Sequence, residues 1–319
     1  MEKTAAQSTP AIDLNPLFRK LILGATHSGL ISGFVRRYGM RLGAARFVAG
    51  ETLDACVEVL RGLNANGLFT NTTLLGEGVL DNSAVEAAVS TYETILDRIA
   101  AEKLKTNVAL KLTHIGLDLG EDAAYANLER LLERAAAHGN FIRIDMEESA
   151  RVDATLRIYR RLREAGYDNV GTVLQSYLFR TEADLESLLD LEPNLRLVKG
   201  AYLEPPEVAF PDKKDVDRTL VKLAERMLTT QGYTAIATHD DAIIDHLIAF
   251  TEERGIPRDR FEFQMLYGVR TQRQLELVQR GYKVLVATPY GPEWYFYLMR
   301  RLAERPANVL FMARNFFRS

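Results

Sequence analysis

The sequence predicts an α/β fold, a (β/α)8 barrel of the TIM type preceded by extra N-terminal helices. Two observations carry this prediction. Eight short runs rich in β-branched residues alternate along the chain with segments of helical period. These runs are also apolar almost throughout, as parallel strands are when both of their faces are buried. A chain of 319 residues is long enough to form such a barrel as one unit.

The expected strands and helices alternate in order. The strand segments comprise residues 67–75, 107–112, 140–145, 169–175, 195–201, 233–238, 261–266 and 282–288. The helical segments comprise residues 84–103, 125–137, 150–165, 183–189, 215–230, 241–253, 272–279 and 293–304. Pro292 and Pro306 are start and stop signals for the last helix. Residues 1–45 have a helical pattern outside the repeat, so we expect an N-terminal extension over 1–45 and a catalytic barrel over 46–319.

The competing architecture is an open, doubly wound sheet, but no glycine-rich phosphate loop follows any strand. A net charge of −3 without a basic stripe argues against nucleic acid as a partner. Cys56 is the single cysteine and no leader precedes the fold, which favours a cytoplasmic location. We expect Cys56 to be buried, and the apolar segment 21–35 to be too short to cross a membrane.

Polar side chains gather where the expected strands end, which is the face of a barrel where chemistry takes place. They are Glu77, Lys111, Asp145, Glu147, Gln175, Arg196, Lys199, Thr238, His239, Glu262 and Gln264. Each has an ordinary alternative: Lys111 could extend to water, and His239 could be a structural histidine. Asp145 or Glu147 could cap the next helix. Because these side chains converge at the same end of at least six strands, we favour a single polar surface inside that end of the barrel, the barrel floor.

The last expected helix contains two adjacent arginines, Arg300 and Arg301. If that helix lies across a ligand site, the two guanidinium groups form a strong carboxylate clamp, because each offers a planar fork of donors. The alternative is a solvated basic face on which Arg300 pairs with Glu304.

These segments resemble the FAD-dependent proline dehydrogenases, specifically the short monofunctional bacterial form. The matching motifs, in the family's order, are LLGE over 74–77, LKL over 110–112, IDME over 144–147, VLQSY over 173–177, LVKGAY over 197–202, ATHD over 237–240, FEFQMLYG over 261–268 and YLMRRLAERP over 297–306. The family's fold is a distorted (β/α)8 barrel. Its FAD lies across the carboxyl ends without a dinucleotide fingerprint, so the missing glycine motif is no objection.

The resemblance implies site residues by position. Lys111, Arg300 and Arg301 hold the substrate carboxylate, and Tyr202 lines the pocket. Asp145 is the active-site acid, while Arg196 lies near flavin N5 and stabilises the negative charge that develops as hydride arrives. The FAD-binding residues are Met146, Gln175, Arg196, Val198, Lys199, Gly200, Ala201, Thr238, His239 and Glu304.

The implied reaction is hydride transfer from L-proline to flavin N5, which gives 1-pyrroline-5-carboxylate and then, by hydrolysis, a semialdehyde. The implied electron acceptor is a membrane quinone, reached by transient contact with the membrane surface. Two other enzyme classes stay open. A Schiff-base aldolase would use Lys111 or Lys199 beside acids. A metal-dependent hydrolase would use His239, Asp240, Asp145 and Glu147, but the chain has only five histidines and no His-x-His pair.

Ala287 departs from the family pattern. Aligned through Pro289 and the double arginine, it replaces a tyrosine that covers the far edge of the proline ring in proline-oxidising members. We therefore expect a pocket that is open at ring carbons three and four and suited to hydroxyproline or another substituted cyclic amino acid. Refilling of the gap by Phe296, Tyr290 or another side chain is the alternative.

Overall fold

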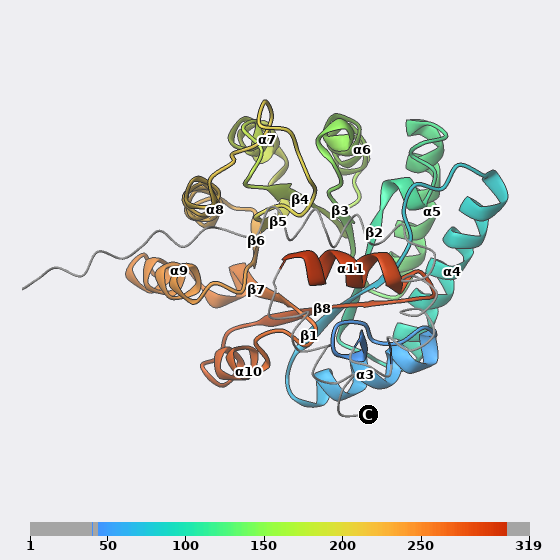
Figure 1. The fold of residues 1–319 in the computed structure, drawn as a ribbon, viewed down its shortest axis with the longest axis horizontal. Coiled ribbons are helices and arrows are strands. Elements are labelled where there is room, and N and C mark those ends of the chain that lie inside the picture. Colours follow the sequence, from blue (N-terminus) through green and yellow to red (C-terminus); the bar gives the residue numbers. More distant parts are fainter. Residues whose placement is uncertain (1–39, 41–43, 305–319) are drawn as a thin grey trace, which may run out of the picture. The chain divides into compact units, whose positions relative to one another are not determined.

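A computed structural model describes residue 40 and residues 44–304, without the side chains of residues 300–304. Eight parallel strands close into a barrel in chain order, which confirms the expected fold and excludes the open sheet (Figure 1). The strands are β1 Phe69–Leu74, β2 Thr106–Lys111, β3 Ile142–Asp145, β4 Val170–Gln175, β5 Asn194–Val198, β6 Tyr233–Ala237, β7 Phe261–Leu266 and β8 Val284–Tyr290.

One α-helix follows each strand from β1 to β7, and these helices surround the barrel (Figure 1). They are α4 Asn82–Ala101, α5 Glu121–Ala137, α6 Val152–Glu164, α7 Thr181–Leu188, α8 Lys213–Leu228, α9 Asp241–Glu253 and α10 Thr271–Gln279. The described residues also form α3 Leu53–Ala65 and α11 Trp294–Glu304. Short 3-10 helices occupy Ala44–Arg46, Leu112–His114, Ser149–Arg151, Leu189–Leu191 and Arg258–Arg260.

The chain divides into two compact units. One comprises residues 47–292 and contains the whole barrel, and the other comprises residues 1–46 with residues 293–319. The division into 1–45 and 46–319 stays a prediction. In the part of the chain that the structure describes, no helix combines the length and apolarity needed to cross a membrane. The segment 21–35 lies outside the described residues.

Helix α3 was not expected, although its sequence contains a helical signal. Thr52 caps it by accepting a hydrogen bond from Ala55 N at 3.3 Å, and its buried face is formed by Cys56, Val57 and Leu60. The expected burial of Cys56 is confirmed, and burial raises the pKa of its thiol to about 11.

The expected strand over 195–201 was three residues too long at its carboxyl end. Gly200 has a φ of +115°, in the region that favours glycine, and a Cβ at this position would collide with the ring of Tyr177. The chain therefore leaves the sheet after Val198 and turns into the loop that leads to α8.

The apolar core lies between the strands and the helices. Successive residues of a strand point to opposite faces of the sheet. Leu110, Ile144 and Leu197 point outward and are fully buried against the helix layer. The alternate residues point into the barrel, and many of these are polar. This polar interior departs from barrels in which Val, Ile and Leu fill the centre.

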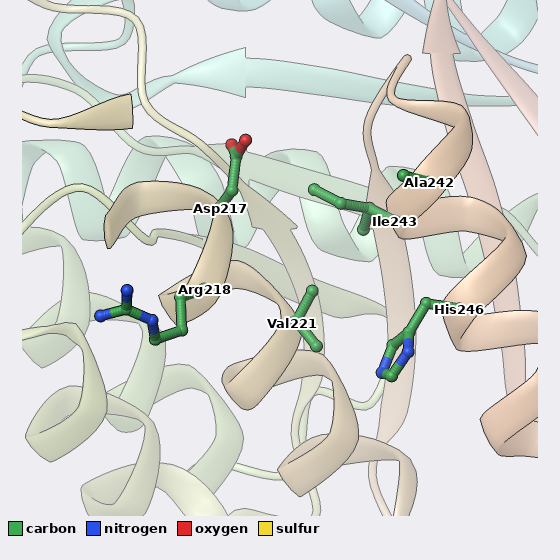
Figure 2. A pocket seen from close by; sticks show the side chains of 6 residues that line it. All are labelled: Asp217, Arg218, Val221, Ala242, Ile243 and His246. Atoms are coloured by element: carbon green, nitrogen blue, oxygen red, sulfur yellow. The ribbon is translucent and has the colours of Figure 1, made fainter. Parts of the chain in front are cut away.

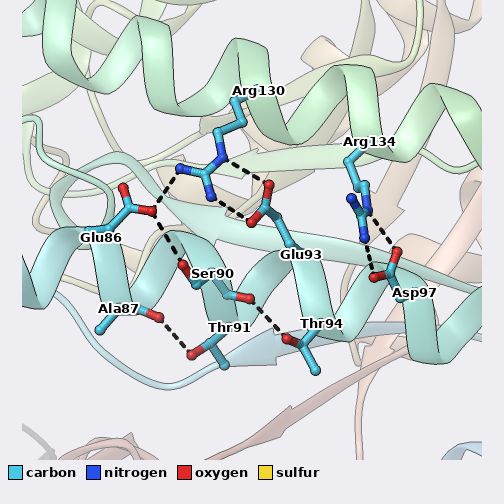
Figure 3. A network of polar contacts seen from close by, with 9 residues as sticks. All are labelled: Glu86, Ala87, Ser90, Thr91, Glu93, Thr94, Asp97, Arg130 and Arg134. Atoms are coloured by element: carbon cyan, nitrogen blue, oxygen red, sulfur yellow. Dashed lines mark hydrogen bonds and ion pairs between the residues drawn. The ribbon is translucent and has the colours of Figure 1, made fainter.

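Ion pairs link the outer faces of α4 and α5 (Figure 3). Arg130 on α5 donates to Glu86 at 2.8 Å and to both carboxylate oxygens of Glu93, and Arg134 pairs with Asp97. These side chains are partly exposed, so each pair contributes at most about 1 kcal/mol, and packing holds the two helices together.

Candidate active site

An arginine–aspartate pair occupies the centre of the barrel floor. Arg196 Nη1 donates to Asp145 Oδ1 at 2.6 Å, and Nη2 lies 3.5 Å from Asn71 Oδ1. These residues come from β5, β3 and β1, which are not neighbouring strands, so they meet through the barrel interior. Arg196 is 9% exposed, and the Asn71 amide donates to Asn107 at 2.6 Å. Two expected catalytic residues are thus in direct contact.

Lys111 lies at the end of β2, opposite Asp145 of β3 in the strand register. Its ammonium forms an ion pair with Glu77, which follows β1, and its side chain is only 14% exposed. The ion pair itself is exposed, so extension of Lys111 toward the surface stays an alternative to its predicted role. The pair places a cation at the rim beside the Asp145–Arg196 floor.

Glu147 connects the carboxyl ends of β2, β3 and β4. It is buried, and it accepts hydrogen bonds from Thr113 N at 3.1 Å and Thr113 Oγ1 at 2.6 Å. Its backbone carbonyl accepts from Gln175 Nε2 at 2.9 Å. Burial raises the pKa of the Glu147 carboxyl, while the Thr113 donors oppose that rise. Helix capping by Asp145 or Glu147 is wrong, because the next helical turn begins at Ser149 with Glu148 in the capping position, and α6 follows at Val152.

His239 joins the ends of β6 and β7. Its Nε2 accepts a hydrogen bond from Leu266 N at 2.9 Å, and the preceding Thr238 is buried and accepts from Asp240 N at 3.2 Å. This hydrogen bond supports the alternative in which His239 has a structural role. In the described residues, no three His, Cys, Asp or Glu side chains form a group that could hold a metal ion.

Lys199 pairs with acids rather than with the Asp145–Arg196 floor. Its ammonium lies 2.6 Å from Asp217 of α8 and 3.2 Å from Asp240. Asp217 also lines a shallow groove between α8 and α9 (Figure 2). The other lining residues are Arg218, Val221, Ala242, Ile243 and His246, so the groove contains no expected site residue.

The loop after β5 carries Ala201 and Tyr202 and is fixed on two sides. Glu204 accepts from Ser149 N and Ser149 Oγ, both at 2.6 Å. Further along, Phe210 N donates to Tyr177 O at 2.7 Å. The loop covers a small apolar cluster that includes Met146, Val173, Tyr177 and Val216. These contacts fix the backbone on which Tyr202 is carried.

The structure adds polar interior residues that sequence reasoning did not select for the site: Asn71, Asn107, Arg143, Asn194 and Lys283. The signal was available, because residues two apart on a strand share a face. Arg143 precedes Asp145 by two, and Asn194 precedes Arg196 by two. The side chains of Arg300, Arg301 and Glu304 lie outside the described residues, so their roles stay predictions.

His114 should make stability depend on pH. It is buried, its Nδ1 lies 3.2 Å from Tyr92 Oη, and burial lowers its pKa from 6.5 to about 4, helped by the charge of Lys111. Between pH 6.5 and 4 the unfolded chain binds a proton that the folded one does not. Stability is therefore fully present above pH 6.5 and falls by about 3 kcal/mol as the pH drops to 4.

Urea unfolding at pH 7.5 and 4.5 measures this effect. His114→Gln should lose less stability between the two values than the parent, by about 2 kcal/mol. His246→Gln, on the exposed face of α9, is the matched control and should behave as the parent. Equal losses in His114→Gln and the parent would contradict the assignment.

A closed barrel with a cationic, hydrogen-bonded floor at the carboxyl ends of its strands defines an enzyme of the (β/α)8 class. A sequence model described as proline dehydrogenase matches residues 56–314. Proline dehydrogenase 2 of Bacillus subtilis strain 168 is 45% identical over 295 residues, which are 92% of this chain and 96% of the relative. Proline dehydrogenase of Deinococcus radiodurans is 41% identical over 305 residues, 94% and 98% of the two chains. The chain belongs to the proline dehydrogenase family, as the resemblance indicated.

A solved structure of proline utilization A (PutA) from Bdellovibrio bacteriovorus has the same barrel. It superposes with a TM-score of 0.78 at 25% identity, over 90% of this chain and 36% of the PutA chain. This chain therefore spans about a third of the length of that protein.

Proposed function

We infer that the chain oxidises L-proline to 1-pyrroline-5-carboxylate, with FAD as the hydride acceptor. The observation that carries this proposal is the buried Arg196–Asp145 pair on the barrel floor. A cationic donor held rigidly where negative charge develops is what hydride transfer requires from the protein. The names of the relatives from Bacillus and Deinococcus support proline as the substrate.

The residues at the floor fit a flavin. Arg196 Nε is buried and finds no hydrogen-bond acceptor among the described residues, so it is available to a ligand acceptor. Gly200 lets the backbone after β5 pass close to the ring of Tyr177, where a Cβ would collide. We assign the cofactor to Arg196 and to the other residues implied by the resemblance, namely Met146, Gln175, Val198, Lys199, Gly200, Ala201, Thr238, His239 and Glu304. A bound flavin supplies the two-electron oxidant.

The protein's own part in the reaction is to position and to stabilise charge. Asp145 holds the Arg196 guanidinium in one orientation. Lys111, Arg300 and Arg301 would bind the substrate carboxylate, with Glu77 fixing the Lys111 ammonium. The aldolase alternative fits less well, because Lys111 and Lys199 are both engaged by carboxylates rather than placed in the apolar pocket that activates such a lysine.

The absorbance spectrum of the purified protein tests this function. We expect a flavin spectrum that L-proline bleaches in the absence of oxygen. A colourless protein that borohydride inactivates in the presence of a carbonyl substrate would instead support an aldolase. Reduction of a soluble quinone analogue, with and without lipid vesicles, tests the further proposal that a cytoplasmic enzyme passes electrons to a membrane quinone.

A substituted proline is the second candidate substrate, and Ala287 is the observation that favours it. Ala287 lies in β8 beside Asn71 of β1 and Leu266 of β7, on the interior face of the sheet. Tyr290 does not refill the gap. It lies three residues after Ala287 in the same strand, so its side chain is on the opposite face of the sheet, where it lines a groove with Leu53 and Ser90. Phe296 lies in the other unit, so its part stays open.

Ala287→Tyr should restore preference for plain proline. The missing tyrosine forgoes about 1.5–3 kcal/mol of apolar contact with the ring, roughly tenfold or more in affinity. We therefore expect the parent to discriminate little between proline and 4-hydroxyproline and the variant to prefer proline. The measurement is kcat/KM for both amino acids with an artificial acceptor. Strong proline preference in the parent, unaltered in the variant, would reject the enlarged pocket and leave the family assignment intact.

A further inference from the structure

We propose that Arg143, in the layer beneath Arg196, is a positioning residue that acts through its charge. Its guanidinium makes the electrostatic potential at the barrel floor more positive and thereby favours the reduced, negatively charged form of the bound flavin. This inference rests on the proposed function, since it needs a flavin at the floor. It assigns a part in the reaction to a residue that touches neither substrate nor cofactor.

The barrel is built to receive this guanidinium. Arg143 is 2% exposed, and its Nη1 donates to Asn194 O at 2.7 Å and to Thr172 O at 3.0 Å. Its Nη2 donates to Asn194 Oδ1 at 2.5 Å. On β4 the neighbouring position is Gly171, where any Cβ would collide with Arg143 Nη1. The sequence thus leaves out a side chain to make room for a buried cation.

The charge of Arg143 is not cancelled by its own partners. All three acceptors are neutral amide oxygens, and no carboxylate among residues 44–299 forms an ion pair with Arg143. Burial lowers the pKa of Arg143 to about 10, with a further contribution from the charge of Arg196. The group therefore stays charged at neutral pH, and its field reaches the floor above through a medium that screens poorly.

The nearby carboxylates are committed to other cations. Asp145 pairs with Arg196 at 2.6 Å, and Glu262 pairs with Lys283 at 2.9 Å. Glu262 also accepts from Tyr233 Oη at 3.0 Å and from Gln264 Nε2 at 2.6 Å. In the part of the chain that the structure describes, Arg196 and Lys283 thus each have a carboxylate partner, and Arg143 has none.

A purely structural role explains Arg143 poorly. Barrel interiors are ordinarily filled by Val, Ile and Leu, and a buried charge held by neutral acceptors carries a large desolvation cost. A methionine of similar length would fill the space at lower cost. Retention of a charge directly beneath the site where negative charge appears is better explained by its electrostatic effect.

The test is the midpoint potential of the bound flavin, measured anaerobically in variants of the intact holoenzyme. In Arg143→Met the affinity for reduced flavin, relative to oxidised flavin, should fall about tenfold. For a two-electron couple this lowers the potential by ~30 mV. Arg143→Lys should stay near the parent, because the charge is kept. Glu262→Gln removes a buried anion from the barrel interior and should shift the potential the opposite way.

Arg260→Met is the matched control. This arginine also donates to neutral oxygens, those of Thr230, Gln231 and Gly232, but it lies in a 3-10 helix before β7 rather than on the interior face of a strand. The midpoint potential of the flavin in Arg260→Met should equal that of the parent. If Arg143→Met does not fold, the Arg143→Lys and Glu262→Gln pair carries the test.

The outcomes separate this inference from the function on which it rests. A protein that binds no flavin overturns both. A flavoprotein in which Arg143→Met and Arg143→Lys behave alike, or in which Glu262→Gln fails to raise the potential, overturns the role of Arg143 and leaves the proposed function standing. Opposite shifts from the two charge removals support the inference.

Discussion

Replacement of Arg196 by methionine should slow reduction of the bound flavin by roughly 100-fold or more, while the affinity for proline changes less than tenfold. The reason is that Arg196 is the buried cationic donor on the floor, held by Asp145 at 2.6 Å, and it acts on charge that appears only during transfer. Rapid mixing of oxidised enzyme with L-proline, followed by flavin absorbance, separates the rate constant for reduction from binding.

Two further variants show whether the loss belongs to the arginine itself. Arg196→Met leaves Asp145 without its cation, so the double variant Arg196→Met with Asp145→Asn removes that unpaired charge and should stay slow. Arg180→Met, which breaks a partly exposed pair with Asp184, should leave the rate at the parent value. Reduction of Arg196→Met at the parent rate would refute the assigned role.

Loss of either arginine of the final helix should weaken substrate binding by roughly 2–5 kcal/mol and leave the flavin bound. Arg300 and Arg301 are adjacent near the end of α11, and the family resemblance places both on the substrate carboxylate. The measurement is the dissociation constant of a non-reactive carboxylate analogue, read from the change in flavin absorbance, in Arg300→Ala and Arg301→Ala.

Arg254→Ala is a suitable control, because this arginine stacks on Phe250 at the outer end of α9. It should bind the analogue as the parent does. Unchanged binding and unchanged steady-state kinetics in both Arg300→Ala and Arg301→Ala would show that the pair is a solvated basic face.

The existence of each strand could be predicted because short segments with β-branched and apolar residues alternate with segments of helical period, even where the residues facing the interior are polar. The segment over 261–266 matches β7 at both ends, and that over 241–253 matches α9. The end of β5 could not be found in this way, because it depends on the left-handed backbone of Gly200 and its contact with Tyr177. Helix α3 was missed although Cys56, Val57 and Leu60 have helical spacing.

Within the site, the convergence of Lys111, Asp145 and Arg196 followed from the barrel alone, since all carboxyl ends meet at one face. The residues with which they form ion pairs could not be predicted from the barrel alone. Lys199 pairs with Asp217, which lies on the next helix, and such a contact depends on how α8 packs. The neutral environment of Arg143 is likewise formed by three strands and could not be recognised from one.

The division between an apolar outer layer and a polar interior gives substitutions in the two layers different consequences. Substitutions such as Ile144→Ala or Leu197→Ala remove packing and should cost roughly 2–5 kcal/mol of stability wherever they occur in the outer layer. Interior positions such as Ala287 contribute less to that layer. A change at Ala287 therefore leaves the packing between sheet and helices in place, and the shape of the pocket can be altered without a loss in that layer.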